Sequence, residues 1–152
     1  MKRTLLVWIV DCICAILLIG CTLWVAFRYG SLPDRIPIHY GANGVINGYG
    51  SKGMIWLLIT IMWVVVGLMS VVEQFPKLWN TGFKLTKENH CRLLALTWHF
   101  MSTTKLAISV IFAYTVVMCA RGGNLSPLFL PLVLAVLFAN SLYWIFKLAI
   151  NR

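Results

Sequence analysis

The run LLVWIVDCICAILLIGCTLWVAF, residues 5–27, decides the fold class of this chain. Asp11 is its only charged residue, and the remaining positions are almost all apolar. A helix that crosses a bilayer needs about 20 consecutive, mostly apolar residues. The run therefore predicts a membrane-spanning helix at the start of the chain.

Two further runs, 54–73 and 127–149, have the same character, and a fourth helix over 87–120 crosses the membrane at 97–120. Hydrophobic residues make up 61% of the chain and charged residues 11%, against about 45–50% and about 25% in soluble domains. The sequence predicts one integral membrane domain over 1–152, an all-α bundle of four transmembrane helices. Thr86 is the expected cap of the third helix.

Basic residues gather at the ends of the proposed spans, and more of them lie beside the termini and the 73–92 connection than beside 28–53 and 121–126. Cytoplasmic loops carry the excess of lysine and arginine. We therefore expect cytoplasmic termini and an outward-facing loop at 28–53. The net charge of +9 is explained by this pattern and by contact with anionic membrane lipids, so no nucleic-acid partner is expected.

Two charged residues fall inside the spans. Asp11 and Lys105 enter from the same side at similar depth, and a charge in hydrocarbon costs about 2.5–3.5 kcal/mol on insertion scales. One interpretation is an intramembrane ion pair between the first and third helices. The other is that each side chain extends separately to the near interface. Asn140, near the middle of the fourth helix, is expected to hydrogen-bond a neighbouring helix.

Signatures of catalysis are missing from the sequence: it has no His-Glu-x-x-His, Gly-x-Ser-x-Gly or phosphate-loop pattern. Cys12 and Cys14 form a Cys-x-Cys pair without a second pair nearby, and His90 and His99 are about 13 Å apart along a helix. We therefore predict no enzyme activity, no catalytic residues, no metal site and no cofactor.

The segment YGSLPDRIPIHYGANGVINGYGSKG, residues 29–53, lies between the first two spans and is unlike them in composition. Pro33 and Pro37 favour extended backbone at the residues before them, and the Asn-Gly pairs favour turns. The segment is predicted to form an irregular or hairpin-like extracytoplasmic loop over 28–53. Asp34 and Arg35 are close enough in sequence to order the imidazole of His39.

Within this segment, LPDRIPIHYGANGVINGYGSK resembles the signature of a bacterial membrane family known as domain of unknown function 1648. The signature residues are Leu32, Pro33, Asp34, Ile36, Pro37, His39, Gly44, Tyr49, Gly50, Ser51 and Lys52. The resemblance continues into the third helix, at TKEN (86–89) and FAYT (112–115). Family members often have Pro-Asp where this chain has Ile46–Asn47, so an acid near His39 is absent.

The resemblance implies the bacterial inner membrane but no defined activity. The same segment is found in SdpI-like proteins, longer membrane proteins that protect cells from a secreted peptide toxin and signal its presence. The first hypothesis is a non-enzymatic membrane protein whose loop recognises a peptide, lipid or protein partner, as in immunity or sensing. The alternatives are a subunit or stabiliser of a larger complex, and a small transporter or membrane enzyme. The oligomeric state is left open.

Overall fold

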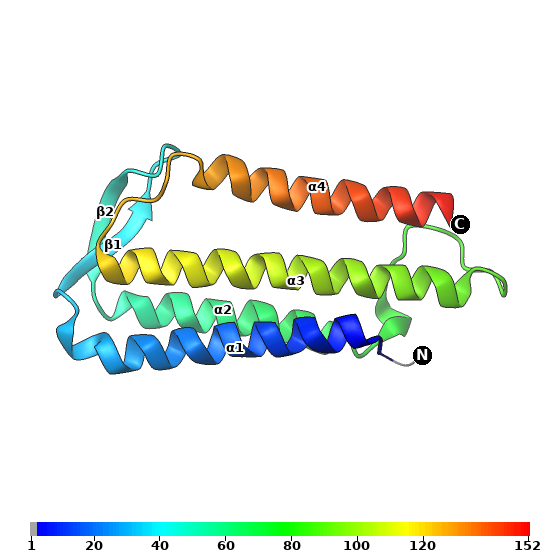
Figure 1. Ribbon diagram of the computed structural model, residues 1–152, viewed down its shortest axis with the longest axis horizontal. Helices are drawn as coiled ribbons and strands as arrows, with labels where there is room; N and C mark the ends of the chain where they lie inside the picture. Colours follow the sequence, from blue (N-terminus) through cyan, green and yellow to red (C-terminus); the bar gives the residue numbers. More distant parts are fainter. Residues whose placement is uncertain (1–2) are drawn as a thin grey trace.

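The computed structural model describes residues 3–152, which form four long helices and a two-stranded sheet (Figure 1). The helices are α1 (Leu5–Arg28), α2 (Met54–Val72), α3 (His90–Arg121) and α4 (Phe129–Ile150), and each is long and apolar enough to cross a membrane. Strands β1 (Arg35–Tyr40) and β2 (Ile46–Ser51) lie between α1 and α2 in the chain. The chain is thus mostly helical, with four candidate membrane spans as the sequence predicts.

The four helices lie side by side, with the sheet at one end of the bundle (Figure 1). Helices α1 and α3 run toward the sheet, whereas α2 and α4 run away from it. Helix α3 packs against each of the other three helices, and α4 packs mainly against α3. The start of α1, the end of α4 and the α2–α3 connection therefore lie together at the end opposite the sheet.

Helix α3 begins at His90 rather than at residue 87, with Asn89 as the residue directly before it. Thr86 caps the turn that leads into the helix, as the sequence predicts, because Thr86 and Asn89 bind each other's backbone and the His90 amide donates to the Thr86 carbonyl at 3.0 Å. The Thr86 amide donates to Asn89 Oδ1 at 2.7 Å, and the Asn89 amide donates to Thr86 Oγ1 at 3.3 Å. Helix α4 likewise begins two residues after Pro127, beyond a turn closed by a bond from the Phe129 amide to the Ser126 carbonyl.

Two apolar clusters fill the space between α1, α2 and α3. The cluster near the sheet contains Val25, Leu32, Ile36, Ile55, Ile59, Val116 and Ala120. The cluster deeper in the bundle contains Val10, Cys14, Leu18, Met62 and Val66. Because Leu32 and Ile36 belong to the first cluster, the segment that joins α1 to α2 is packed onto the helix bundle rather than extended away from it.

The β1–β2 hairpin is antiparallel and pairs Ile36 with Gly50 and Pro37 with Tyr49. Its turn is bound to the α3–α4 connection, because the Leu125 amide donates to the Gly44 carbonyl at 2.9 Å and the Ile46 amide donates to Asn124 Oδ1 at 2.9 Å. Gly44 has a positive φ of 78°, and a Cβ at this position would lie 2.4 Å from the Leu125 carbonyl oxygen. Only glycine fits here.

Candidate functional site

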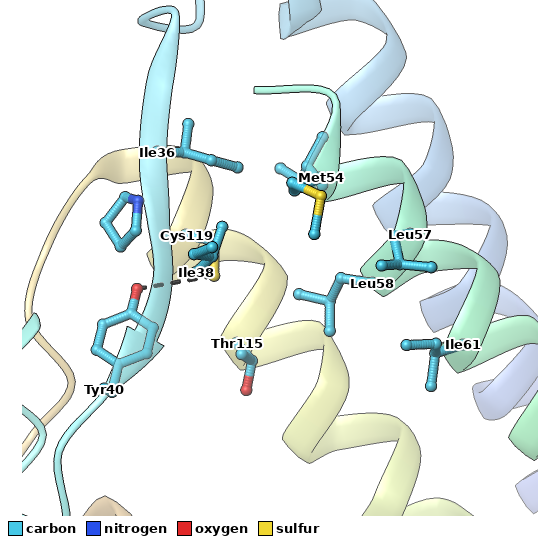
Figure 2. A pocket seen from close by; sticks show the side chains of 11 residues that line it. Ile36, Ile38, Tyr40, Met54, Leu57, Leu58, Ile61, Thr115 and Cys119 are labelled. Carbon is cyan, nitrogen blue, oxygen red and sulfur yellow. Dashed lines mark hydrogen bonds between the residues drawn. The ribbon is translucent and has the colours of Figure 1, made fainter. Parts of the chain in front are cut away.

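An apolar pocket of about 210 Å³ lies beneath the hairpin, between β1, α2 and α3 (Figure 2). Its lining residues are Ile36, Pro37, Ile38, Tyr40, Met54, Ile55, Leu57, Leu58, Ile61, Thr115 and Cys119. Ile36 and Ile55 are buried at its base, whereas Ile38 and Leu57 are 44% and 51% exposed. The pocket is therefore open along one side of the molecule.

Tyr40 supplies one of the few polar groups in this pocket. Its hydroxyl donates a hydrogen bond to Cys119 Sγ at 3.7 Å, drawn as a dashed line in Figure 2. Burial, followed by the contact with Cys119, raises the pKa of the Tyr40 hydroxyl well above its usual value. Tyr40 thus stays protonated at neutral pH and acts as a hydrogen-bond donor. Such a lining suits the binding of an apolar group.

The outer surface of the hairpin is more polar. His39 Nδ1 forms a hydrogen bond with Asn47 Oδ1 across the two strands. Asp34 does not order the imidazole as the sequence suggested, because its carboxylate pairs with Lys52 Nζ at 3.0 Å. The side chain that holds His39 therefore comes from the opposite strand, at the position where an acid was expected.

A separate buried ion cluster joins the three inner helices near the end opposite the hairpin. Lys105 on α3 is fully buried, and its Nζ lies 2.7 Å from Asp11 Oδ1 on α1 and 2.8 Å from Glu73 Oε2. Ser70 Oγ on α2 is a further partner at 3.3 Å. Arg3 pairs with the second oxygen of Asp11 at 2.9 Å. The structure thus has Asp11 and Lys105 in contact rather than extended separately to the interface.

The formal charges of this cluster balance, because Arg3 and Lys105 face Asp11 and Glu73. A buried ion pair without compensation costs several kcal/mol per charge, so the balance explains how these side chains are tolerated between apolar helices. Glu73 Oε1 and Ser102 Oγ are buried and have no hydrogen-bond partner within residues 3–152.

Glu73 was not predicted as a site residue, and the structure makes it the second acidic partner of Lys105. Glu73 directly follows Val72, the last residue of α2, and lies three residues after Ser70. Residues three apart share a helix face, so the pair marks a polar face at the end of this span. The three-residue spacing of Ser70 and Glu73 was the available signal in the sequence. Whether this polar face meets Lys105 depends on how α2 is rotated toward α3.

Residues 16–63 match the model of a family described as "Domain of unknown function (DUF1648)". The chain carries a DUF1648 segment. This segment runs from the middle of α1 through the hairpin and into α2. No curated protein and no solved structure matches the chain significantly. The match ends at residue 63, so the predicted continuation of the resemblance into the third helix lies outside it.

The DUF1648 segment contains every predicted signature residue. These residues differ in how far the structure buries them. Leu32, Ile36 and Pro37 are buried under the hairpin, and Gly44 is buried in its turn. Pro33, Asp34, His39, Tyr49 and Ser51 are exposed on the hairpin surface. Gly50 and Lys52 are half-buried, with Lys52 Nζ 5.7 Å from the centre of the Tyr29 ring. Asp11 and Lys105 lie outside the segment.

Asn140 on α4 is hydrogen-bonded to α3, as predicted. Its amide nitrogen donates to Thr104 Oγ1 at 2.9 Å, and its carbonyl oxygen accepts from Thr103 Oγ1 at 2.8 Å. Trp144 Nε1 also donates to Thr103 Oγ1, at 2.9 Å. This polar contact fixes α4 against α3 and is separate from the pocket and from the ion cluster.

Proposed function

We propose that this chain is a non-enzymatic protein of the bacterial inner membrane whose outward-facing hairpin recognises a peptide, in toxin immunity or sensing. The observation that carries the proposal is the apolar pocket beneath β1. Two signature residues of the DUF1648 segment, Ile36 and Pro37, form part of its wall. A peptide that reaches the membrane surface inserts an apolar side chain into this pocket.

The size and surroundings of the pocket support a peptide ligand. A cavity of about 210 Å³ is below the range of about 300–1,000 Å³ typical of sites that enclose a whole small molecule. It suits one or two apolar side chains, with the rest of the ligand outside. The exposed His39, Asn47 and Tyr49 do not line the pocket, and they are available to the part of a peptide that stays outside it.

The distribution of charge over the two ends of the bundle supports an orientation. Seven basic residues belong to the chain ends, the α2–α3 connection or the adjoining helix turns, and four belong to the hairpin end: Arg3, Lys77, Lys84, Lys87, Arg92, Lys147 and Arg152 against Arg28, Arg35, Lys52 and Arg121. Excess lysine and arginine favours the cytoplasmic side. We therefore place both termini in the cytoplasm and the hairpin outside, where it meets a secreted peptide.

The core of the bundle favours recognition over transport. Transport requires a water-accessible route between the hairpin and the ion cluster. From Asp11 toward the hairpin, the buried residues of α1 are Cys14, Leu18 and Val25, which pack in the two apolar clusters. This apolar packing separates Lys105 from the polar surface of the hairpin.

The test is a deletion strain challenged with a panel of secreted peptide toxins and complemented with variants. The Thr115→Phe variant fills the pocket from α3, and Thr60→Phe is the matched control because Thr60 is exposed on α2 and does not line the pocket. We expect the deletion to increase sensitivity to at least one toxin, and we expect the wild type and Thr60→Phe to restore resistance while Thr115→Phe does not. Unchanged sensitivity across the panel, or full complementation by a stably expressed Thr115→Phe, would contradict the proposal.

A further inference from the structure

A second apolar groove, of about 310 Å³, runs between α1 and α3 toward the hairpin end of the bundle. Leu17, Gly20 and Trp24 line it on α1, and Val117 and Arg121 line it on α3. A Cβ added to Gly20 would meet no atom within 4 Å. The groove is therefore open at Gly20, and it is distinct from the pocket beneath the hairpin, which lies between α2, α3 and β1.

Two arginines lie at the hairpin end of this groove. Arg121 is the last residue of α3 and is exposed. Arg28 is the last residue of α1, one turn beyond Trp24, and its Cζ lies 5.4 Å from the centre of the Trp24 ring. Neither arginine forms an ion pair with any acid in the described chain, residues 3–152. Their positive charge is thus available to a ligand.

We propose that this groove binds an anionic phospholipid, with the phosphate at Arg28 and Arg121 and an acyl chain along α1. Arginine binds phosphate through two parallel hydrogen bonds, and a tryptophan beside it is typical of the membrane–water interface. The stretch from Ile16 to Arg28 is about 18 Å of helix at 1.5 Å per residue. One leaflet of hydrocarbon is about 15 Å thick, so the groove matches the reach of one acyl chain.

The charge pattern distinguishes this site from the other grooves of the molecule. The groove between α3 and α4 is mostly apolar, and its lining has the hydroxyls of Tyr114 and Ser126 but no charged side chain. The groove between α1 and α2 reaches Arg3, but that arginine is neutralised by Asp11. Of these three grooves and the pocket beneath the hairpin, only the α1–α3 groove combines an apolar floor with a cation that has no acidic partner within residues 3–152.

Native mass spectrometry tests the proposal on the full-length protein extracted from vesicles of equal parts phosphatidylglycerol and phosphatidylcholine. The wild type is expected to retain phosphatidylglycerol in preference to phosphatidylcholine. A basic residue near anionic lipid contributes about 1 kcal/mol and about 1.4 kcal/mol is tenfold, so each arginine accounts for about a fivefold preference. Arg28→Gln with Arg121→Gln is expected to lower the preference by about 25-fold, while Arg35→Gln on β1 leaves it unchanged.

A second pair of variants tests the groove itself. Gly20→Leu fills the groove and is expected to reduce lipid retention severalfold, whereas Gly67→Leu on α2 is the control, because a Cβ there also meets no atom within 4 Å. Equal retention of both lipids by the wild type would overturn the proposal without any variant. The proposal would also be overturned if the protein forms a dimer that Gly20→Leu disrupts and Gly67→Leu does not, because the groove would then hold a second copy of the chain.

Discussion

Lys105 makes the closest contacts between charged groups of different helices within residues 3–152. Its ammonium is fully buried and contacts two carboxylates, that of Asp11 on α1 and that of Glu73 directly after α2. Both carboxylates compensate the buried lysine, but they differ in their dependence on it: Asp11 also pairs with Arg3, whereas Lys105 is the cation that Glu73 contacts. At the scale of single residues, this one side chain links α3 to α1 and to the end of α2.

Replacing Lys105 with methionine is expected to lower the free energy of unfolding by about 3–5 kcal/mol, because it leaves Glu73 buried without a cation. Adding Glu73→Met is expected to recover most of this loss, since Asp11 keeps its partner Arg3. Thermal unfolding in detergent measures both effects. Lys147→Met, on the surface of α4, is the control, and a double variant no more stable than the single one would contradict the prediction.

The hairpin is the element whose position depends most on backbone contacts with another part of the chain. Its turn is bound to the α3–α4 connection through Gly44 and Asn124, which are far apart in sequence. The glycine at 44 is required both by its positive φ and by the approach of the Leu125 carbonyl. The contact between the hairpin turn and the α3–α4 connection therefore requires glycine at this position.

The Gly44→Ala variant is expected to destabilise the docked hairpin by about 1–2 kcal/mol from the left-handed backbone alone, with a further loss from the contact with Leu125. Hydrogen exchange at the amides of Leu125 and Ile46 measures the effect, because these amides donate the bonds that hold the turn. Gly30→Ala is the matched control, since Gly30 has open space around it and no positive φ. Unchanged exchange in Gly44→Ala would show that the turn is held elsewhere.

Helix α4 depends on the polar contact at Asn140 for its alignment with α3. The Asn140→Leu variant removes two hydrogen bonds to Thr103 and Thr104, and such bonds average about 0.6 kcal/mol each in membranes. We expect a loss of about 1 kcal/mol in the free energy of unfolding, measured by thermal unfolding in detergent. The neighbouring Ser141→Leu has no such bonds to lose within residues 3–152 and should behave as the wild type. An equal effect of both variants would assign the loss to changed packing.

At the scale of the whole molecule, the hairpin lies at the end of the bundle opposite the start of α1 and the end of α4, and all four helices are long enough to cross a bilayer. Every feature assigned to recognition, namely the pocket, the polar hairpin surface and the signature residues, is at the hairpin end. The ion cluster is near the other end. The proposed function therefore requires the hairpin end to face outward.

Orientation is tested by labelling with a membrane-impermeant maleimide. Ser51→Cys places a thiol on the exposed hairpin, and the native Cys91, exposed at the start of α3, reports the opposite end. We expect Ser51→Cys to react in intact cells and Cys91 to react only after permeabilisation. The reverse order of labelling would show that the termini face outward, and it would contradict the proposed site of recognition.

The sequence by itself determined the number and approximate bounds of the helices, because the thickness of the hydrocarbon core sets a minimum length of apolar residues that can be read along one dimension. It also indicated that Asp11, Lys105 and Asn140 require partners, since unpaired polar groups are costly in lipid. Only the tertiary structure decided that Glu73 joins Lys105, that Asn47 holds His39 and that the α3–α4 connection binds the hairpin. The physical reason is that these contacts depend on how each helix is rotated and how deep it lies, and composition and spacing along a single helix constrain neither.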